Sequence, residues 1–244
     1  MTLLLLAGTG EAHAIARALA AQGTPVLASL AGALRSGADY PVPLRTGGFG
    51  GAEGFIGALP GHGITAVLDA THPFAARITI RTARLCRELG LPYARLSRPA
   101  WQAGPGDRWH TAATPEEAAA LVPDGATVLL ATGIGTIDRY AGLAGRTRVH
   151  CRRIDPDDRP FPFAGGSWLT GRGPFDLASE TALFRRLGIT WIVTKNAGGE
   201  GARPKLDAAR ALGLDVAMIA RPPDPEGCTV LHTVPEALDW VAAR

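Results

Sequence analysis

The chain begins with an apolar run that stops at two closely spaced glycines and then continues into a helix-forming stretch. Leu3 to Ala7 are followed by Gly8-Thr9-Gly10-Glu11-Ala12, and the helical pattern runs on to Ala21. Glycine permits positive φ and a close approach of the main chain, while the first N–H groups of a helix are unpaired donors at the positive end of its dipole. A strand, glycine turn and helix in this order favour a loop that binds a pyrophosphate.

The same pattern also occurs as ordinary turn chemistry. The full dinucleotide fingerprint requires a third glycine at position 13, where this chain has His13. The glycine loop is therefore one indication of a dinucleotide site, and the second strand has to supply another.

The second apolar run ends without the acidic residue that is typical of NAD-selective folds. About 20 residues after the glycines, such folds place Asp or Glu against the ribose 2′-hydroxyl. Here Val26 to Ala28 lead into Ser29, Gly32 and Arg35, and no carboxylate is present. A guanidinium binds a 2′-phosphate in bidentate fashion, whereas a carboxylate repels it. The sequence therefore predicts NADP(H) as cofactor; the alternative for Arg35 is a solvated loop arginine.

Composition excludes several classes of protein. A chain of 244 residues with 46% apolar content suits one large or two modest domains, and a net charge of +3 without a basic, aromatic-rich patch argues against nucleic-acid binding. No run reaches the roughly 18 apolar residues of a membrane span. The first 23 residues lack a basic region typical of a signal peptide, so we expect a cytoplasmic protein. Cys86, Cys151 and Cys228 are scattered, which predicts neither a disulfide framework nor a metal site.

Apolar runs alternate with helical patterns twice along the chain, and continuous apolar strands indicate parallel sheets covered on both faces. The first half has strands at Leu3 to Ala7, Val26 to Leu30, Ala66 to Ala70 and Tyr93 to Leu96, with helices at Glu11 to Gln22, Ala52 to Leu59 and Phe74 to Leu89.

The second half repeats the alternation after a segment rich in proline and glycine. Its strands are expected at Thr127 to Ala131, Thr147 to Arg152, Trp191 to Thr194, Asp215 to Ile219 and Thr229 to Leu231, and its helices at Pro115 to Leu121, Phe175 to Leu187, Arg203 to Leu212 and Pro235 to Ala243. We therefore predict an α/β protein with two doubly wound, Rossmann-like domains, residues 1–97 binding NADP and residues 98–244 binding substrate, with a cleft between them.

A second strand end in the first half carries chemically useful residues. The run before Asp69 breaks at Thr71-His72-Pro73. Ligands of open parallel sheets bind beyond the carboxyl ends of the strands, so this segment should share a rim with the Gly8 loop and contact the cofactor. A helix cap for Thr71 and a partly buried structural histidine are the alternatives. His72 is also a candidate proton donor, supported only by its position.

Two strand ends in the second half suggest an anion site. Thr132-Gly133 follow one apolar run, and Lys195-Asn196 lead from another into the glycine pair Gly198-Gly199. Lys195 is one of only two lysines, and a lysine beside a glycine loop suits an anionic substrate or a phosphate. The spacing does not match a P-loop, and a capped turn with a solvated lysine is the alternative.

Taken in order, these motifs resemble the precorrin-6A reductases of vitamin B12 biosynthesis along the whole chain. The segments that carry the resemblance are Gly8-Thr9-Gly10-Glu11-Ala12, Asp69-Ala70-Thr71-His72-Pro73-Phe74-Ala75, Arg98-Pro99-Ala100-Trp101, Thr132-Gly133, Val193-Thr194-Lys195-Asn196-Ala197-Gly198-Gly199 and Met218-Ile219-Ala220-Arg221-Pro222. The Asp-Ala-Thr-His-Pro and Lys-Asn-x-Gly-Gly segments are the specific ones.

The resemblance implies NADPH-dependent reduction of one double bond of the precorrin-6A macrocycle, giving precorrin-6B. It implies a tetrapyrrole substrate bound by Arg98, Trp101 and the Thr132 and Lys195 segments, and it is compatible with transient contacts with neighbouring pathway enzymes. An acid-rich macrocycle would need cationic side chains and an apolar surface such as Trp101. Two alternatives stay open: an NADPH-dependent reductase of another anionic substrate, and a dinucleotide-sensing module without turnover.

Overall fold

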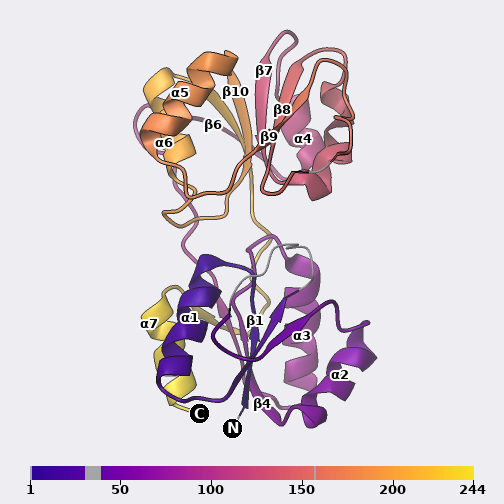
Figure 1. The fold of residues 1–244 in the computed structure, drawn as a ribbon, viewed down its shortest axis with the longest axis vertical. Helices are drawn as coiled ribbons and strands as arrows, with labels where there is room; N and C mark the ends of the chain where they lie inside the picture. The colour runs from indigo at the N-terminus through magenta and orange to yellow at the C-terminus, as the bar shows by residue number, and fades with distance from the viewer. Residues whose placement is uncertain (1, 31–39, 157) are drawn as a thin grey trace. The chain divides into compact units, whose positions relative to one another are not determined.

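A computed structural model describes residues 2–30, 40–156 and 158–244 (Figure 1). The chain divides into two compact units, one made of Met1–Pro99 with Pro222–Arg244 and the other of Ala100–Arg221. Each unit holds a six-stranded parallel sheet flanked by helices, which confirms the predicted fold class of two Rossmann-like domains. None of the helices in the described residues is both long and apolar enough to cross a membrane.

The sheet of the first unit has β1 near its centre. The strand order is β12-β5-β4-β1-β2-β3, and the paired strands are parallel. The strands are β1 (Thr2–Leu6), β2 (Val26–Leu30), β3 (Leu44–Thr46), β4 (Ile64–Asp69), β5 (Tyr93–Leu96) and β12 (Thr229–Leu231). Four of the five β1 side chains are buried, which is expected when helices cover both faces of a sheet.

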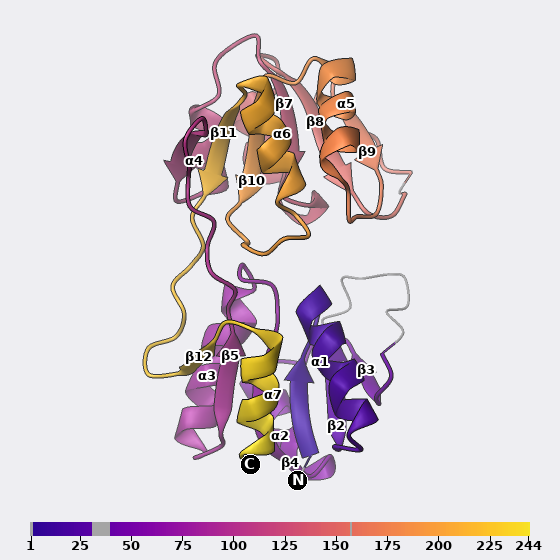
Figure 2. The ribbon, with the colours of Figure 1, turned by 90° about the vertical axis from the view of Figure 1, so that its left-hand side faces the viewer.

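Helices cover the two faces of this sheet in pairs. They are α1 (Gly10–Ala21), α2 (Ala52–Gly61), α3 (Ala76–Glu88) and α7 (Val234–Ala242). Leu3 and Leu5 pack into one core with α1 and α7, which lie side by side in Figure 2. Leu4 and Leu6 pack into the opposite core with α2 and α3. The alternation along β1 is the period of two that a strand imposes on its side chains.

The C-terminal segment returns to the first unit, which corrects the predicted domain boundary. The sequence pattern placed all of residues 98–244 in the second domain. In the structure β12 pairs with β5, and α7 packs beside α1. Burial explains the return, because Leu231 and Trp240 are 9% and 8% exposed within the first core. An apolar run shows that a strand is buried and leaves open which sheet it joins.

The sheet of the second unit has β10 and β7 at its centre. Its order is β6-β11-β10-β7-β8-β9, again with parallel pairs. The strands are β6 (Arg108–Ala112), β7 (Thr127–Ala131), β8 (Arg148–Arg153), β9 (Ser167–Thr170), β10 (Trp191–Lys195) and β11 (Asp215–Ile219). The helical segments are α4 (Pro115–Ala120), the 3₁₀ segment η1 (Ile134–Leu143), α5 (Leu177–Leu187) and α6 (Pro204–Leu212).

Local sequence signals explain where several of these helices begin. The hydroxyl of Thr114 caps α4 by accepting the Glu117 N–H at 3.1 Å, and Pro115 occupies the first turn. The carboxylate of Asp176 caps α5 by accepting the Ser179 N–H at 2.7 Å. Such caps satisfy donors that the helix itself leaves unpaired. Leu129 of β7 and Phe184 of α5 then meet in one core of the second unit.

Trp240→Ala should lower the free energy of unfolding by about 3–5 kcal/mol, because it removes a buried indole from the first core and leaves a cavity. Urea unfolding measures the change. Ile80→Ala is the matched control: Ile80 lies on α3 of the same unit and is 54% exposed, so its effect should stay near about 0.5 kcal/mol. Two equally small effects would contradict the placement of α7 in the first core.

Candidate functional site

The carboxyl ends of β1 and β4, two neighbouring central strands, lie side by side in the first sheet. From β1 the chain passes through α1 to β2 on one side, while β4 pairs on the other side. Such a reversal opens a crevice between neighbouring parallel strands, where ligands of open α/β sheets bind. A small pocket here is lined by Thr9, Glu11, Ala70, Thr71, Pro73, Leu96 and Arg98. The structure therefore brings the Gly8 loop and the Thr71 segment to one rim, as the strand-end argument predicts.

The loop between β1 and α1 has free space and backbone donors. Gly8 adopts a φ of +129°, and a side chain at Gly8 or Gly10 would meet no atom beyond its chain neighbours within 4 Å. Thr9 caps α1, since its hydroxyl oxygen accepts the Ala12 N–H at 3.1 Å and donates to the Ala70 carbonyl at 2.8 Å. The first N–H groups of α1 have no carbonyl partner within the helix. The loop thus fits the pyrophosphate of a dinucleotide.

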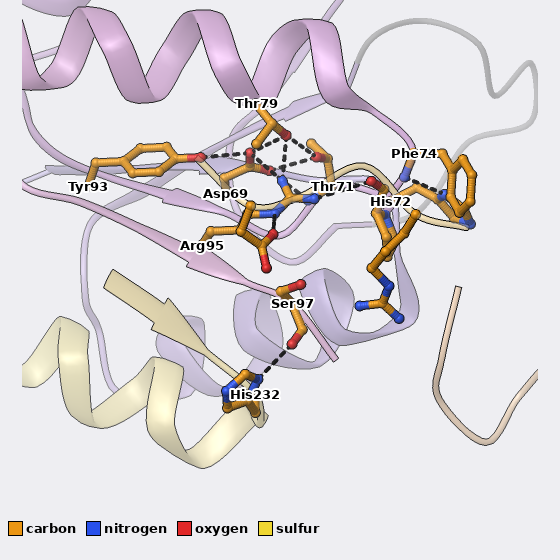
Figure 3. Close-up of polar contacts among 12 residues, drawn as sticks. Asp69, Thr71, His72, Phe74, Thr79, Tyr93, Arg95, Ser97 and His232 are labelled. Carbon is orange, nitrogen blue, oxygen red and sulfur yellow. Dashed lines mark hydrogen bonds and ion pairs between the residues drawn. The ribbon is translucent and has the colours of Figure 1, made fainter. Parts of the chain in front are cut away.

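Asp69, the last residue of β4, is fully buried and accepts hydrogen bonds from four side chains and one backbone N–H (Figure 3). Its Oδ1 accepts the N–H and the hydroxyl of Thr71 at 2.9 and 2.7 Å. Its Oδ2 accepts from the Thr79 hydroxyl at 2.7 Å, the Tyr93 hydroxyl at 3.0 Å and Arg95 Nη1 at 3.0 Å. These bonds compensate the cost of burying a carboxylate.

Arg95 extends the Asp69 cluster to two further segments. Its Nε donates to Asp224 at 2.6 Å, and its Nη2 lies 3.5 Å from the Pro73 carbonyl. Burial lowers the pKa of Arg95, but the charges of Asp69 and Asp224 outweigh this effect and raise the pKa overall. A single buried guanidinium therefore connects the end of β4, the loop that follows it and the returning C-terminal segment.

The predicted ligand residues Thr71 and His72 differ in their surroundings. Thr71 is buried and donates its hydroxyl proton to Asp69, so it lines the pocket with a hydroxyl already engaged. His72 is exposed, and its Nδ1 accepts the Phe74 N–H at 3.2 Å. An accepting Nδ1 places the proton of the neutral imidazole on Nε2. His72 is therefore held with its proton-bearing nitrogen on the side of the ring away from this backbone contact.

Glu11 and Arg98 form an ion pair at the pocket. Arg98 Nη1 donates to both carboxylate oxygens, at 2.8 and 2.9 Å. Burial raises the pKa of Glu11, but the hydrogen bond from Arg98 and the Glu11 N–H outweigh it, and the pKa is lowered overall. The sequence pattern predicts Arg98 in the second domain; in the structure it belongs to the first unit, because it lies two residues after the end of β5 and pairs with a residue of α1.

The residues predicted to read the 2′-phosphate are only partly described. Ser29 lies in β2, one residue before the strand ends, and is 6% exposed. Gly32 and Arg35 lie outside the described residues. The predicted preference for NADP(H) therefore rests on the sequence argument alone.

Tyr40 is a neighbour of the glycine loop that sequence reasoning missed. It hydrogen-bonds to the backbone of Gly8, and its ring packs edge-on against His13 with 5.1 Å between ring centroids. Burial raises the pKa of the Tyr40 hydroxyl. His13 occupies the position where the dinucleotide fingerprint has its third glycine. The side chain that replaces this glycine packs against the ring of Tyr40. No sequence spacing marks Tyr40, because a tertiary contact brings it to the loop.

The second unit has an equivalent strand-end site between β7 and β10. The chain leaves β7 toward β8 on one side, and β10 pairs on the other. Lys195 Nζ donates to the Thr132 carbonyl at 2.9 Å, which joins the two predicted segments. Gly133, Gly198 and Gly199 have φ values of +82°, +67° and +79°, a region that favours glycine. Burial and the nearby charge of Arg139 lower the pKa of Lys195.

Asn196 and Trp101 hold this loop in place. The Asn196 side-chain oxygen accepts the Trp101 N–H at 2.9 Å, and its amide nitrogen donates to the Trp101 carbonyl at 3.0 Å. The indole N–H of Trp101 donates to the Gly199 carbonyl at 3.0 Å. Trp101 is 8% exposed and packs in the core. It therefore offers little surface to a macrocycle, in contrast to the expected apolar platform, and it supports the loop instead.

Lys205, the other lysine, was assigned no role by the sequence and lies below this loop. Its Nζ donates to the Ala202 carbonyl at 2.8 Å and lies 5.1 Å from the centroid of the Trp101 ring. Burial lowers the pKa of Lys205 to about 8, although the charge of Glu180 acts in the opposite direction. Through these contacts with Ala202 and Trp101, the Lys205 side chain supports the loop from the core.

The fold and the crevice define a two-unit Rossmann-like protein whose first unit has a dinucleotide-type loop at a strand reversal. The family model of precorrin-6x reductase CbiJ/CobK matches residues 2–242. The chain belongs to this family.

Relatives and a solved structure agree with this assignment. A precorrin-6A reductase of Rhodococcus erythropolis is 44% identical over 98% of this chain and 96% of its own, and one of Rhodobacter capsulatus is 39% identical over 98% and 95%. The solved structure of CobK precorrin-6A reductase has a TM-score of 0.94 and 37% identity, covering 100% of this chain and 96% of that one. Three relatives named cobalt-precorrin-6A reductase match at 27–30% identity.

Asp69→Asn should lower the free energy of unfolding by about 3–5 kcal/mol, because it removes the buried carboxylate that pairs with Arg95 and leaves only the partly exposed Asp224 as its charge partner. Urea unfolding measures the loss. Glu88→Gln is the matched control: it breaks the Arg84 pair on α3, whose side chains are 50% and 51% exposed, and should cost about 0–1 kcal/mol. Similar losses for both variants would mean that the buried cluster contributes no more than a surface pair.

Lys205→Met should change the pH dependence of stability. The ordinary lysine pKa is 10.5 and the folded value is about 8, so between these pH values the unfolded chain binds a proton that the folded protein has released. The Lys205 contribution to stability therefore rises with pH across this window. Urea unfolding of both proteins at several pH values should show the advantage of Lys205→Met shrinking from pH 8 toward 10.5. A constant difference would contradict the lowered pKa of Lys205 in the folded protein.

Proposed function

We propose that this protein reduces one double bond of metal-free precorrin-6A with NADPH. The observation that carries the proposal is a family match over almost the whole chain, in a structure whose first unit keeps an open glycine loop at the β1 and β4 reversal. The metal-free macrocycle is favoured because the relatives at 39–44% identity are named for it, whereas those named for the cobalt form match at 27–30%.

The first unit would hold the cofactor. Gly8, Thr9 and Gly10, with the start of α1 at Glu11 and Ala12, would bind the pyrophosphate through backbone N–H groups. Thr71, His72 and Pro73 would contact the nicotinamide side of the crevice, since Thr71 and Pro73 line the pocket there. Ser29, Gly32 and Arg35 would bind the 2′-phosphate, as the sequence argument predicts, because a guanidinium binds phosphate well.

When bound, NADPH supplies a hydride to one atom of the reduced double bond. The other atom needs a proton. His72 is the candidate donor, because it lies between Thr71 and Pro73, which line the pocket. Its contact with Phe74 leaves the proton of the neutral ring on Nε2. The protein contributes orientation of both reactants and the placement of this proton, and it needs no nucleophile.

The second unit would bind the carboxylates of the macrocycle. Lys195 would supply the charge, and Gly198 and Gly199 would supply backbone N–H groups in a loop that Asn196 holds. Thr132 and Gly133 lie against Lys195 through the Nζ to carbonyl bond. A partly desolvated ammonium binds carboxylates more strongly than an exposed one, because screening by water is weaker.

The test is anaerobic NADPH oxidation with precorrin-6A, combined with cofactor titration by fluorescence. The wild type should oxidise NADPH only with the macrocycle present and should bind NADPH more tightly than NADH. Gly10→Val should weaken NADPH binding at least about tenfold, because a branched side chain would occupy the open space of the loop. Lys195→Ala should keep NADPH affinity within about twofold and lower kcat/KM for precorrin-6A at least about tenfold.

The outcomes separate the proposal from its competitors. NADPH binding without oxidation would favour a sensing module, and oxidation with another anionic substrate alone would favour a different reductase. Equal affinity for NADH and NADPH would contradict the 2′-phosphate argument. Unchanged kinetics in Lys195→Ala would remove Lys195 from the substrate site.

A further inference from the structure

Glu11 places a carboxylate where the proposed function requires an anion to bind. It is the second residue of α1, which begins at Gly10, and it lines the pocket beside Thr9. The N-terminus of a helix favours one negative group. A carboxylate and a pyrophosphate in the same first turn would repel each other, and the partly buried pocket screens that repulsion less than bulk water does.

Arg98 supplies the opposite charge at this point. One of its nitrogens, Nη1, contacts both oxygens of Glu11, at 2.8 and 2.9 Å. The two side chains are only 20% and 27% exposed, so solvent screens the pair incompletely. Arg98 follows β5, and the strand order β5-β4-β1 means that the pair crosses the end of β4. The contact therefore spans the same crevice that the dinucleotide would enter.

We propose that Arg98 determines dinucleotide affinity by neutralising Glu11, so that the first turn of α1 can accept a pyrophosphate. This inference rests on the proposed function and assigns Arg98 to the cofactor side of the reaction. Arg98 is then a positioning residue that acts through Glu11. Its effect concerns the pyrophosphate, which NADPH and NADH share.

A cycle of variants distinguishes neutralisation from direct contact with the cofactor. Arg98→Ala should weaken NADPH binding at least about tenfold, because the unpaired carboxylate repels the pyrophosphate. Glu11→Gln should bind NADPH more tightly than the wild type, since the repelling charge is gone and Arg98 remains. The double variant Glu11→Gln/Arg98→Ala should return to within about threefold of the wild type.

The readout is the equilibrium dissociation constant of NADPH, measured by fluorescence titration without substrate. Thermal unfolding of each variant establishes that the protein is folded. Arg84→Ala is the matched control, since it breaks an Arg–Glu pair of the same unit on α3, away from the crevice; its affinity should equal that of the wild type. NADH affinity should fall by the same factor as NADPH affinity in Arg98→Ala.

Several results would overturn the inference. A double variant as weak as Arg98→Ala would mean that Arg98 contacts the dinucleotide directly, and weaker binding in Glu11→Gln would make Glu11 itself a ligand. A loss confined to NADPH would place Arg98 at the 2′-phosphate. If the wild type binds neither dinucleotide, the proposed function fails together with this inference; if it binds and the cycle shows no rescue, only the role of Arg98 fails.

Discussion

The crevice of the first unit depends on one buried charge. Asp69 is inaccessible to solvent, and a carboxylate in that position is tolerated only because donors surround both of its oxygens. The donors come from the loop after β4, from α3 and from β5. The hydrogen bonds that stabilise the buried Asp69 carboxylate therefore also fix these three segments relative to one another. Arg95 carries the restraint on to Asp224. The loop that carries Thr71 and Pro73 is therefore hydrogen-bonded to the core beneath it.

The loop after β10 in the second unit is held by hydrogen bonds to backbone groups, and none of its described residues is a buried carboxylate of this kind. Asn196 binds both polar groups of the Trp101 backbone, and the indole of Trp101 binds the loop carbonyl at Gly199. Arg221 Nε also donates to the Asn196 carbonyl at 3.2 Å, and the ammonium of Lys195 lies at the carboxyl end of β10, where it donates to the Thr132 carbonyl. The two units thus have similar strand reversals with different electrostatics. The first has a buried carboxylate, Asp69, that is paired with Arg95, and the second has the ammonium of Lys195 at the end of a central strand.

Sequence reasoning succeeded for the central strands and failed at the sheet edges. Strands such as β1 and β10 are buried on both faces and appear as continuous apolar runs, whereas β3, β6 and β9 are edge strands that are short or carry polar residues, and they were not predicted. The fourth edge strand, β12, was predicted but assigned to the wrong sheet. In the site, the strand-end rule brought the right loops together. It misplaced Arg98 and missed Tyr40, because both owe their positions to contacts between distant segments.

The return of the C-terminal segment has a consequence for biosynthesis. A ribosome completes Ala100–Arg221 before it produces β12 and α7, so the unit that begins first in the chain is finished last. Until then β5 has an unpaired edge, and the face of α1 that meets α7 is uncovered. Folding from the N-terminus onward, which is the usual order for domains in one chain, is therefore reversed here: the second unit can fold first, and the first unit is completed only after β12 and α7 have been made.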